Sequence, residues 1–226
     1  MEILLAEDSA TLREGLTVLL ESEGYTVRAA ANGQEALTLF ARRRPDLLLL
    51  DVMMPKKNGF AVCKAVREID SSVPIVFLTA KDSEVDELRG LSLGADDYIS
   101  KTSSQEVMLA RIASILMRVR RALDPLPEET NFTFGTWRVD VTRPCLVAPN
   151  GRCVDLIVRE LEMLRYFQQH PNELLTRDFL LTHFWGLDFL GDEATLSTAI
   201  SRLRKKLDHE GLLIRSIYGQ GYRFEP

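Results

Sequence analysis

The sequence predicts two domains of different class, a doubly wound parallel α/β domain followed by a smaller α+β domain. Three observations predict this. Apolar runs of strand length alternate with stretches of helical period in the first half. Short alternating runs, helical stretches and two closing strands fill the second half. RVRRALDPLPEET at 118–130 has linker composition, so we expect domains at 1–121 and 131–226 joined by a linker at 122–130.

Five short runs are the strand candidates of the first domain. They are EILLA, TVRAA, LLLLD, IVFLT and DYIS, at residues 2–6, 26–30, 47–51, 75–79 and 97–100. Apolar residues at helical spacing follow each run, including Leu12 with Leu16, Phe60 with Cys63, and Val85 with Leu88. Alternating strands and helices indicate a parallel sheet covered on both faces, for which we expect the flavodoxin-like strand order 2-1-3-4-5.

Composition limits the classes of function. A formal net charge of -5 argues against a uniformly basic nucleic-acid binder, although it leaves local basic patches open. No apolar run approaches the ~18 residues of a membrane span, and the apolar stretch in MEILLAED is too short for a signal peptide. We therefore expect a cytoplasmic protein without a membrane partner. Cys145 and Cys153 flank a turn-like PNG and could approach each other across a hairpin, but reduced thiols are the favoured interpretation.

Polar side chains stand at the carboxyl ends of the predicted strands. Glu7 and Asp8 follow the first strand, Asp51 ends the third, Thr79 ends the fourth and Lys101 follows the fifth. Because the carboxyl ends of parallel strands meet at one edge, we expect these groups to lie together. Clustered carboxylates favour Mg²⁺. A cation and Lys101 beside Asp51 would stabilise a phosphoryl group moving onto its carboxylate, with Thr79 donating its hydroxyl to a phosphoryl oxygen.

The first 120 or so residues resemble the receiver domain of two-component response regulators. The matching motifs are Glu7-Asp8, Asp51 followed by MMPKKNG, Thr79-Ala80, and GADDYISK at 94–101. The resemblance implies that Asp51 accepts phosphate from a sensor histidine kinase. It also implies that Asp8, Asp51 and the Met53 carbonyl hold Mg²⁺, and that Thr79 and Tyr98 move together on activation. The family usually has proline after the lysine, whereas Thr102 follows Lys101 here.

The stretch DEATLSTAISRLRKKLDHEG at 192–211 predicts an amphipathic helix with a basic outer side. Its apolar stripe is Leu196, Ile200, Leu203 and Leu207. Polar residues point the opposite way or stand on the flanks: Thr198, Ser201, Arg202, Arg204, Lys205 and Lys206. Four basic residues in five indicate an electrostatic footprint for DNA. For this helix alone, a solvated charged face is the alternative.

The residues after this helix extend the resemblance. LIRSIYGQGYRFEP reads as two strands joined by a glycine turn, and residues 131 to 226 resemble the winged-helix domain of the OmpR/PhoB type of response regulator. The resemblance implies that the helix enters the major groove of promoter DNA, with Arg202 and Lys205 on bases or phosphates. It also implies that Arg204, Lys206 and Arg223 contact DNA phosphates. RNA polymerase is a further candidate partner. Ala194, Ser197 and Ala199 depart from the polar residues that the family often carries there.

The same family forms a symmetric dimer on activation. Carried onto this chain, the family's charge pairs are Asp96 with Arg118 and Asp97 with Arg111. A further family pair falls on Glu87 and Val107 and is lost. We therefore expect a phosphorylation-promoted homodimer that binds two half-sites about one helical turn apart.

Two alternatives stay open. An aspartate-nucleophile, Mg²⁺-dependent phosphatase also carries its acid at a strand end, but it requires a second acid two residues later, where Met53 stands. We therefore expect a phosphoacceptor and not a turnover enzyme. The other alternative is a regulator that binds DNA constitutively, without phosphorylation.

Overall fold

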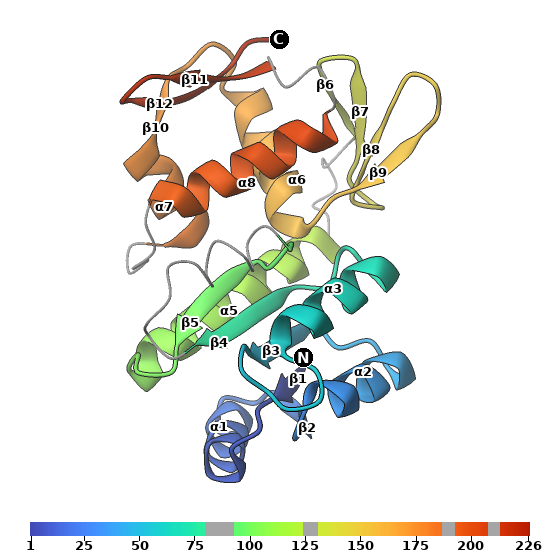
Figure 1. The fold of residues 1–226 in the computed structure, drawn as a ribbon. Coiled ribbons are helices and arrows are strands. Elements are labelled where there is room, and N and C mark those ends of the chain that lie inside the picture. The colour runs from blue at the N-terminus through green and yellow to red at the C-terminus, as the bar shows by residue number, and fades with distance from the viewer. Residues whose placement is uncertain (80–92, 124–130, 187–192, 208–212) are drawn as a thin grey trace. The chain divides into compact units, whose positions relative to one another are not determined.

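The computed structural model (Figure 1) describes residues 1–79, 93–123, 131–186, 193–207 and 213–226, except for the side chains of 118–123 and 193. The chain divides into two compact units, Met1–Val119 and Arg120–Pro226. The last helix of the first unit, α5 (Gln105–Leu123), continues through residues 122 and 123, where we expected the linker to begin. Each unit is described by itself below.

The first unit is a parallel sheet of five strands in the order β2-β1-β3-β4-β5, as the sequence predicts. The strands are β1 (Glu2–Ala6), β2 (Thr26–Ala30), β3 (Leu47–Asp51), β4 (Ile75–Thr79) and β5 (Asp97–Ser100). The described helices besides α5 are α1 (Ala10–Ser22), α2 (Gly33–Arg42) and α3 (Gly59–Ile69). The helix expected around Val85 and Leu88 lies outside the described residues.

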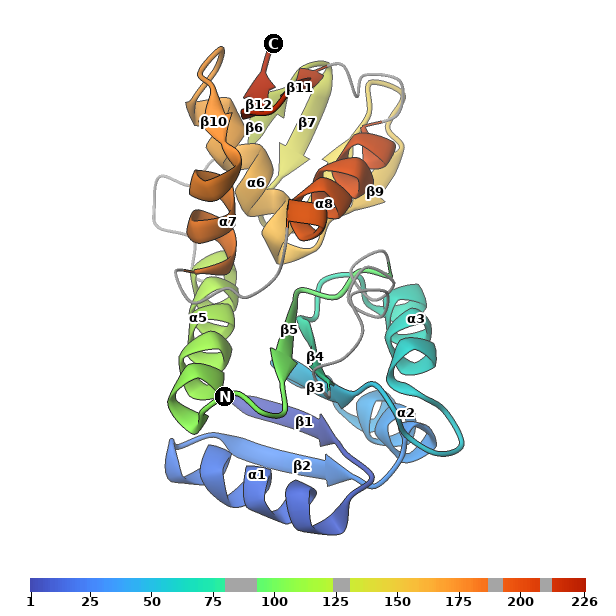
Figure 2. The same ribbon diagram turned by 60° about the vertical axis from the view of Figure 1, so that its left-hand side comes forward.

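The leucine run of β3 is buried on both faces of the sheet. Figure 2 shows α2 and α3 on one face of the sheet and α1 and α5 on the other. Leu48 and Leu50 pack in the layer of α2 and α3, whereas Leu47 and Leu49 pack in the layer of α1 and α5. This alternation follows from the period of two along a strand. All four side chains are fully buried, so β3 is the central strand that carries Asp51 to the edge of the sheet.

Side-chain caps set where the helices begin. Ser9 caps α1, Asn32 caps α2 and Asn58 caps α3, each accepting a hydrogen bond from a backbone N–H of the first turn. Such caps satisfy donors that a helix leaves unpaired. All three caps lie at the carboxyl edge of the sheet, and Ser9 and Asn58 fix the loops that hold Asp8 and Asp51.

The second unit combines two antiparallel sheets with three described helices, which agrees with the predicted α+β class. One sheet contains β6 (Phe132–Phe134), β7 (Trp137–Asp140), β8 (Cys145–Val147) and β9 (Cys153–Asp155) in sequential order. The other contains β10 (Leu175–Thr176), β12 (Gly221–Phe224) and β11 (Ile214–Ile217) in that order. The helices are α6 (Val158–Gln169), α7 (Arg177–Trp185) and α8 (Glu193–Lys206).

The apolar stripe predicted for α8 is buried in the core of the second unit. Leu196, Ile200, Leu203 and Leu207 join Phe134, Phe167 and Phe224 in this core. The opposite side of α8 therefore faces away from this core. Within the described residues, no helix is long and apolar enough to cross a membrane.

Candidate functional site

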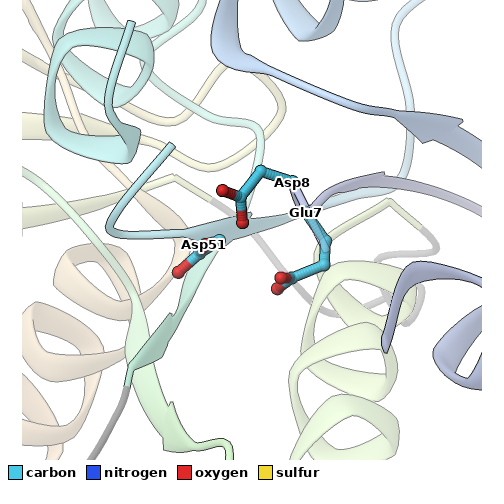
Figure 3. A group of neighbouring side chains, drawn as sticks. All are labelled: Glu7, Asp8 and Asp51. Carbon is cyan, nitrogen blue, oxygen red and sulfur yellow. The ribbon is translucent and has the colours of Figure 1, made fainter. Parts of the chain in front are cut away.

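Three acids meet at the carboxyl edge of the first sheet. Glu7 and Asp8 follow β1 and Asp51 ends β3, and one carboxylate oxygen from each lies within 4.8 Å of the others. Glu7 and Asp51 are 1% and 3% exposed, whereas Asp8 is exposed. The convergence predicted from the strand ends is therefore present (Figure 3).

Lys101 joins the two buried acids. Its Nζ lies 2.9 Å from Glu7 Oε2 and 3.0 Å from Asp51 Oδ1. Its backbone N–H donates to the Thr79 carbonyl at 2.8 Å, so β4 helps to fix the lysine. Thr102, the departure from the family pattern, exchanges a hydrogen bond with Ser100 at 2.8 Å between their hydroxyl oxygens. Lys101 therefore reaches Asp51 without the proline.

Burial and charge oppose each other in this site. Burial is the largest cause of the raised pKa of Asp51, and the hydrogen bonds from Lys101 and the Met53 N–H reduce the rise. Burial also raises the pKa of Glu7 above its ordinary value, and the Asp51 charge adds to the rise. Burial works to lower the pKa of Lys101, but hydrogen bonds and charge from Glu7 and Asp51 outweigh it and raise that pKa. A further positive charge beside the acids would relieve the repulsion that remains.

The two oxygens of Asp51 have different surroundings. Oδ1 accepts from the Met53 N–H at 3.2 Å and contacts Lys101, whereas Oδ2 accepts no hydrogen bond from the residues that the structure describes. One exposed and two buried carboxylates also supply the hard oxygen donors that Mg²⁺ prefers. The site therefore fits a divalent cation and leaves one Asp51 oxygen for a ligand.

Two backbone features position Asp51 and the Glu7-Asp8 pair. A Cβ built on Gly59 would lie 2.3 Å from the Asp51 carbonyl oxygen, so only glycine fits at the start of α3. Arg13 of α1 donates through Nη1 to the carbonyls of Glu7 at 2.8 Å and Asp8 at 3.1 Å. We did not predict Arg13, because its distance from the two acids along the chain carries no motif.

The two residues predicted to move together lie on neighbouring strands. Thr79 ends β4 and pairs with Ser100, one residue before Lys101. Tyr98 is 7% exposed, and its ring centroid lies 5.1 Å from that of Phe77. In this structure Tyr98 is thus part of the core beneath the acidic site.

Both aspartates expected at a dimer face have partners inside the chain. Asp96 Oδ2 accepts from Arg67 Nη2 at 3.0 Å and from the Ile75 N–H at 2.9 Å. Asp97 Oδ2 lies 3.4 Å from Nη1 of Arg111 in the same chain. The Arg118 side chain is outside the described residues. Arg67 was not predicted, because only the fold brings it from α3 to the start of β5.

Two of the basic residues predicted to contact DNA bind a buried acid in this structure. Glu160 of α6 is fully buried and accepts from Arg202 Nε at 2.7 Å and from Lys206 Nζ at 2.6 Å. Burial works to raise the pKa of Glu160, but the charges of Arg202 and Lys206 outweigh it and lower that pKa. Lys206 also donates to the Asp155 carbonyl at 2.8 Å. These contacts anchor α8 to the rest of its domain.

Two further residues predicted to contact DNA, Arg204 and Arg223, have partners in or beside the wing, which is formed by β11, β12 and their turn. Arg204 donates through Nε to the Ile214 carbonyl at 2.8 Å and lies over the Tyr222 ring. Arg223 donates to Glu225, whose other oxygen lies 2.7 Å from Arg215. Tyr218, which we did not predict as a site residue, is 99% exposed at the turn.

The outward side of α8 is narrower than the sequence indicates. Its exposed stripe consists of Ser197, Ser201 and Lys205, spaced four residues apart, with Thr198 half-buried beside it. Ala199, one of the departures from the family pattern, is 6% exposed and packs in the core. Lys205 is the basic residue of this stripe, so the positive charge most open to a partner is near one end of the helix.

A parallel sheet with an acidic cluster and a lysine at its carboxyl edge, followed by a winged-helix unit, defines a receiver domain with a DNA-binding effector domain. Residues 3–113 match the response regulator receiver domain family, and residues 151–224 match the family described as transcriptional regulatory protein, C terminal. The chain belongs to the OmpR/PhoB-type response regulators.

Full-length relatives support this assignment. The sensory transduction protein RegX3 of Mycolicibacterium smegmatis is 36% identical, with 99% of this chain and 98% of the relative covered. The response regulator MprA of Mycobacterium leprae is 39% identical, with 98% and 97% covered. A solved structure of a mutant of the protein RitR has a TM-score of 0.78 at 25% identity and covers 99% of this chain and 98% of that chain. Receiver domains of this kind generally bind Mg²⁺ in an acidic pocket, and the chain carries such a cluster.

Proposed function

We propose that Asp51 accepts a phosphoryl group from a phosphohistidine of a sensor kinase and that this modification controls binding to promoter DNA in the cytoplasm. In the transfer, the bond between phosphorus and the histidine nitrogen breaks, and a bond forms between phosphorus and Asp51 Oδ2. The observation that carries the proposal is the asymmetry of Asp51. Lys101 and the Met53 N–H engage Oδ1, and Oδ2 has no hydrogen bond from the described residues.

Charge neutralisation is the main requirement of phosphoryl transfer. Lys101 supplies one positive charge to the incoming oxygens, and its contact with Glu7 keeps the ammonium in place. Mg²⁺ held by Glu7, Asp8, Asp51 and the Met53 carbonyl would neutralise further charge on the phosphoryl oxygens. Thr79, at the end of the neighbouring strand, would donate its hydroxyl to the phosphoryl group, and Tyr98 would respond to its movement.

The chain assists its own phosphorylation and is not a turnover enzyme in this proposal. An aspartate-nucleophile phosphatase requires an acid two residues after its nucleophile, to serve the leaving group. Met53 occupies that position and is 75% exposed. Its thioether cannot donate or accept a proton in this role.

For the DNA complex we propose that α8 lies in the major groove with Ser201, Lys205 and Thr198 toward the duplex. The wing then contacts the adjacent backbone or minor groove, where Arg204 and Arg223 are phosphate candidates. Arg202 and Lys206 keep α8 in position through Glu160. Phosphorylation would favour a homodimer, with RNA polymerase as a further partner. In the homodimer, Asp96 would exchange Arg67 of its own chain for Arg118 of the other chain. Asp97 would exchange Arg111 of its own chain for Arg111 of the other.

DNA affinity tests the regulatory part of this proposal. Duplexes are first selected from random sequence with the full chain, Mg²⁺ and a small-molecule phosphodonor. Kd and sedimentation are then measured with and without the phosphodonor. We expect tighter binding by at least about tenfold, or roughly 1.4 kcal/mol, and a shift from monomer to dimer. Asp51→Asn should show neither change. Equal affinity of wild type and Asp51→Asn under both conditions would instead establish the constitutive DNA binder.

A further inference from the structure

The hairpin of β8 and β9 carries two cysteines on the same face. Leu146 and Val154 pair across the hairpin and pack toward the core. Side chains alternate along a strand, so Cys145 and Cys153 lie on the opposite face. In the register, Cys145 pairs with Asp155 and Cys153 pairs with Val147, which makes the two cysteines diagonal neighbours.

The hydrogen-bond pattern of the hairpin shows which cross-strand pairs contain the two cysteines. The Leu156 N–H donates to the Pro144 carbonyl, and the Ala148 N–H donates to the Arg152 carbonyl, both at 2.8 Å. Bonded and non-bonded pairs alternate along an antiparallel ladder, so the pairs containing Cys145 and Cys153 are both non-bonded. Non-bonded pairs bring directly opposite side chains closest, and the two cysteines stand diagonally between two such pairs.

The two thiols differ in exposure. Cys145 is 1% exposed, whereas Cys153 is exposed. Burial is the largest cause that raises the pKa of Cys145 to about 11, and the neighbouring Cys153 thiol adds to the rise. Cys153 is therefore the group that a small oxidant reaches first, with Cys145 beside it as the resolving thiol.

We propose that Cys145 and Cys153 form a reversible intramolecular disulfide when the protein meets a hydroperoxide. The Cys153 sulfur attacks one peroxide oxygen, the O–O bond breaks, and a sulfenic acid and water form with hydrogen peroxide as oxidant. The Cys145 sulfur then attacks the Cys153 sulfur and loses its proton, while the S–O bond breaks and a second water leaves. Two thiols are oxidised and one peroxide is reduced.

The position of β9 in the sheet permits this closure. Diagonal neighbours have Cα atoms ~7 to 8 Å apart, whereas disulfides require ~4.4 to 6.8 Å. β9 is an edge strand of its sheet, so it can slide along β8, which shortens the diagonal, without breaking a second ladder. Asp155, two residues after Cys153, accepts through its carbonyl from Lys206 of α8. The bridge would thus form beside an anchor of the helix assigned to DNA.

Peptide mapping of the oxidised full chain tests the proposal. The protein is treated with hydrogen peroxide, alkylated, denatured and digested with trypsin without reductant. Trypsin cleaves after Arg152, between the two cysteines, and does not cleave the Arg143-Pro144 bond. We expect residues 139–152 and 153–159 as one linked species, with the intact chain lighter by two hydrogens. Dithiothreitol should separate the peptides again.

Two variants make the test decisive. Cys153→Ser, at an exposed position, should lose the linked species entirely. Cys145→Ser combined with Val147→Cys moves the buried thiol directly opposite Cys153, so this variant should link and thereby verify the oxidation conditions. The proposal is overturned if this control links while the wild type gains oxygen at Cys153 without losing hydrogens. It is equally overturned if the wild type links Cys153 only to a second chain.

Discussion

Asp51 carries its charge at a position where burial disfavours it. Because its pKa is raised, the folded protein binds this proton more tightly than the unfolded chain does. The associated stability is present below the ordinary pKa of 3.8 and is lost as pH rises through the raised value. The buried negative charge of Asp51 is costly. Binding of Mg²⁺ would offset this charge, and phosphorylation would replace the charged carboxylate oxygen with an acyl phosphate.

Asp51→Asn should therefore stabilise the metal-free protein at neutral pH. We expect the free energy of unfolding of the first domain to rise by about 1 kcal/mol, since a buried charge is replaced by an amide. Denaturant unfolding of the full chain with a chelator at pH 7 measures this. Asp70→Asn is the matched control and should lower the free energy of unfolding. Burial works to raise the pKa of Asp70, but Arg44 and Ser72 outweigh it and lower that pKa, so the charge at this position is stabilising. A less stable Asp51→Asn protein would contradict this account of the site.

Glu160→Gln should destabilise the second domain by ~3 to 5 kcal/mol, because Arg202 and Lys206 lose the buried charge that pairs them. The folded pKa of Glu160 is lowered, so its contribution is present above the ordinary value of 4.5 and is lost as pH falls through the lowered value. The difference between wild type and variant should hence shrink in acid. Glu173→Gln, whose side chain is 62% exposed, is the control and should change stability by less than ~0.5 kcal/mol. Equal effects of the two substitutions at pH 7 would refute the anchoring role of Glu160.

The residues that the sequence predicts well are those positioned by the chain's own pattern. Asp51 and Lys101 each stand at the end of a strand, so a parallel sheet brings them together whatever surrounds it. Arg202 and Lys206 could not be assigned in this way. A helical wheel gives their angle on α8 but not their partner, and Glu160 lies 42 residues before Arg202. Tertiary placement decides whether such a residue anchors a helix or contacts a ligand.

At the scale of elements, the start of α3 sets the distance between this helix and β3. Gly59→Ala would place a methyl group against the Asp51 carbonyl, so we expect a loss of several kcal/mol in stability. Gly15→Ala in α1 meets nothing within 4 Å, and alanine favours a helix by ~1 kcal/mol, so it should be neutral or stabilising. Thermal unfolding of the two variants compares them directly. If Gly59→Ala were as stable as Gly15→Ala, the close approach of α3 to β3 would be wrong.

The exposed stripe of α8 makes a separate prediction about DNA. Lys205→Ala should weaken binding to all duplexes similarly and reduce the slope of log K against log salt by about 1, because one phosphate contact is lost. Fluorescence anisotropy over a salt series measures both effects. Lys64→Ala, an exposed lysine of α3, removes the same charge from the other domain and should leave the slope unchanged. Matching slopes for the two variants would exclude Lys205 from the interface.

Elements that show a period, including the short alternating strands of the second half, were predicted from the sequence, whereas β10 was not. β10 contains two residues, too few for any alternation to be visible. It forms because Gly221 lets β12 approach, since a Cβ there would lie 2.0 Å from the Leu175 carbonyl oxygen. α5 extends to Leu123, into the segment where the linker was expected, because nothing in RVRRAL stops a helix before Pro125.

At the scale of the whole molecule, one domain carries the proposed phosphoacceptor and the other carries the face proposed to bind DNA. Each domain has its own core. Phosphorylation can therefore act on DNA affinity through association of the first domain without reshaping the second. Two weakly binding units joined in a dimer bind paired half-sites much more tightly than either unit alone. The predicted order of events is acyl phosphate first, association second and DNA affinity last.

The intact mass of the full chain after incubation with Mg²⁺ and a small-molecule phosphodonor tests the central claim most directly. The account predicts one added phosphoryl group that requires both Mg²⁺ and Asp51, and is therefore missing with a chelator and in Asp51→Asn. Circular dichroism of the same samples verifies that each protein is folded. No addition to the folded wild-type protein, or an equal addition to Asp51→Asn, would contradict the assignment of Asp51 as the phosphoacceptor.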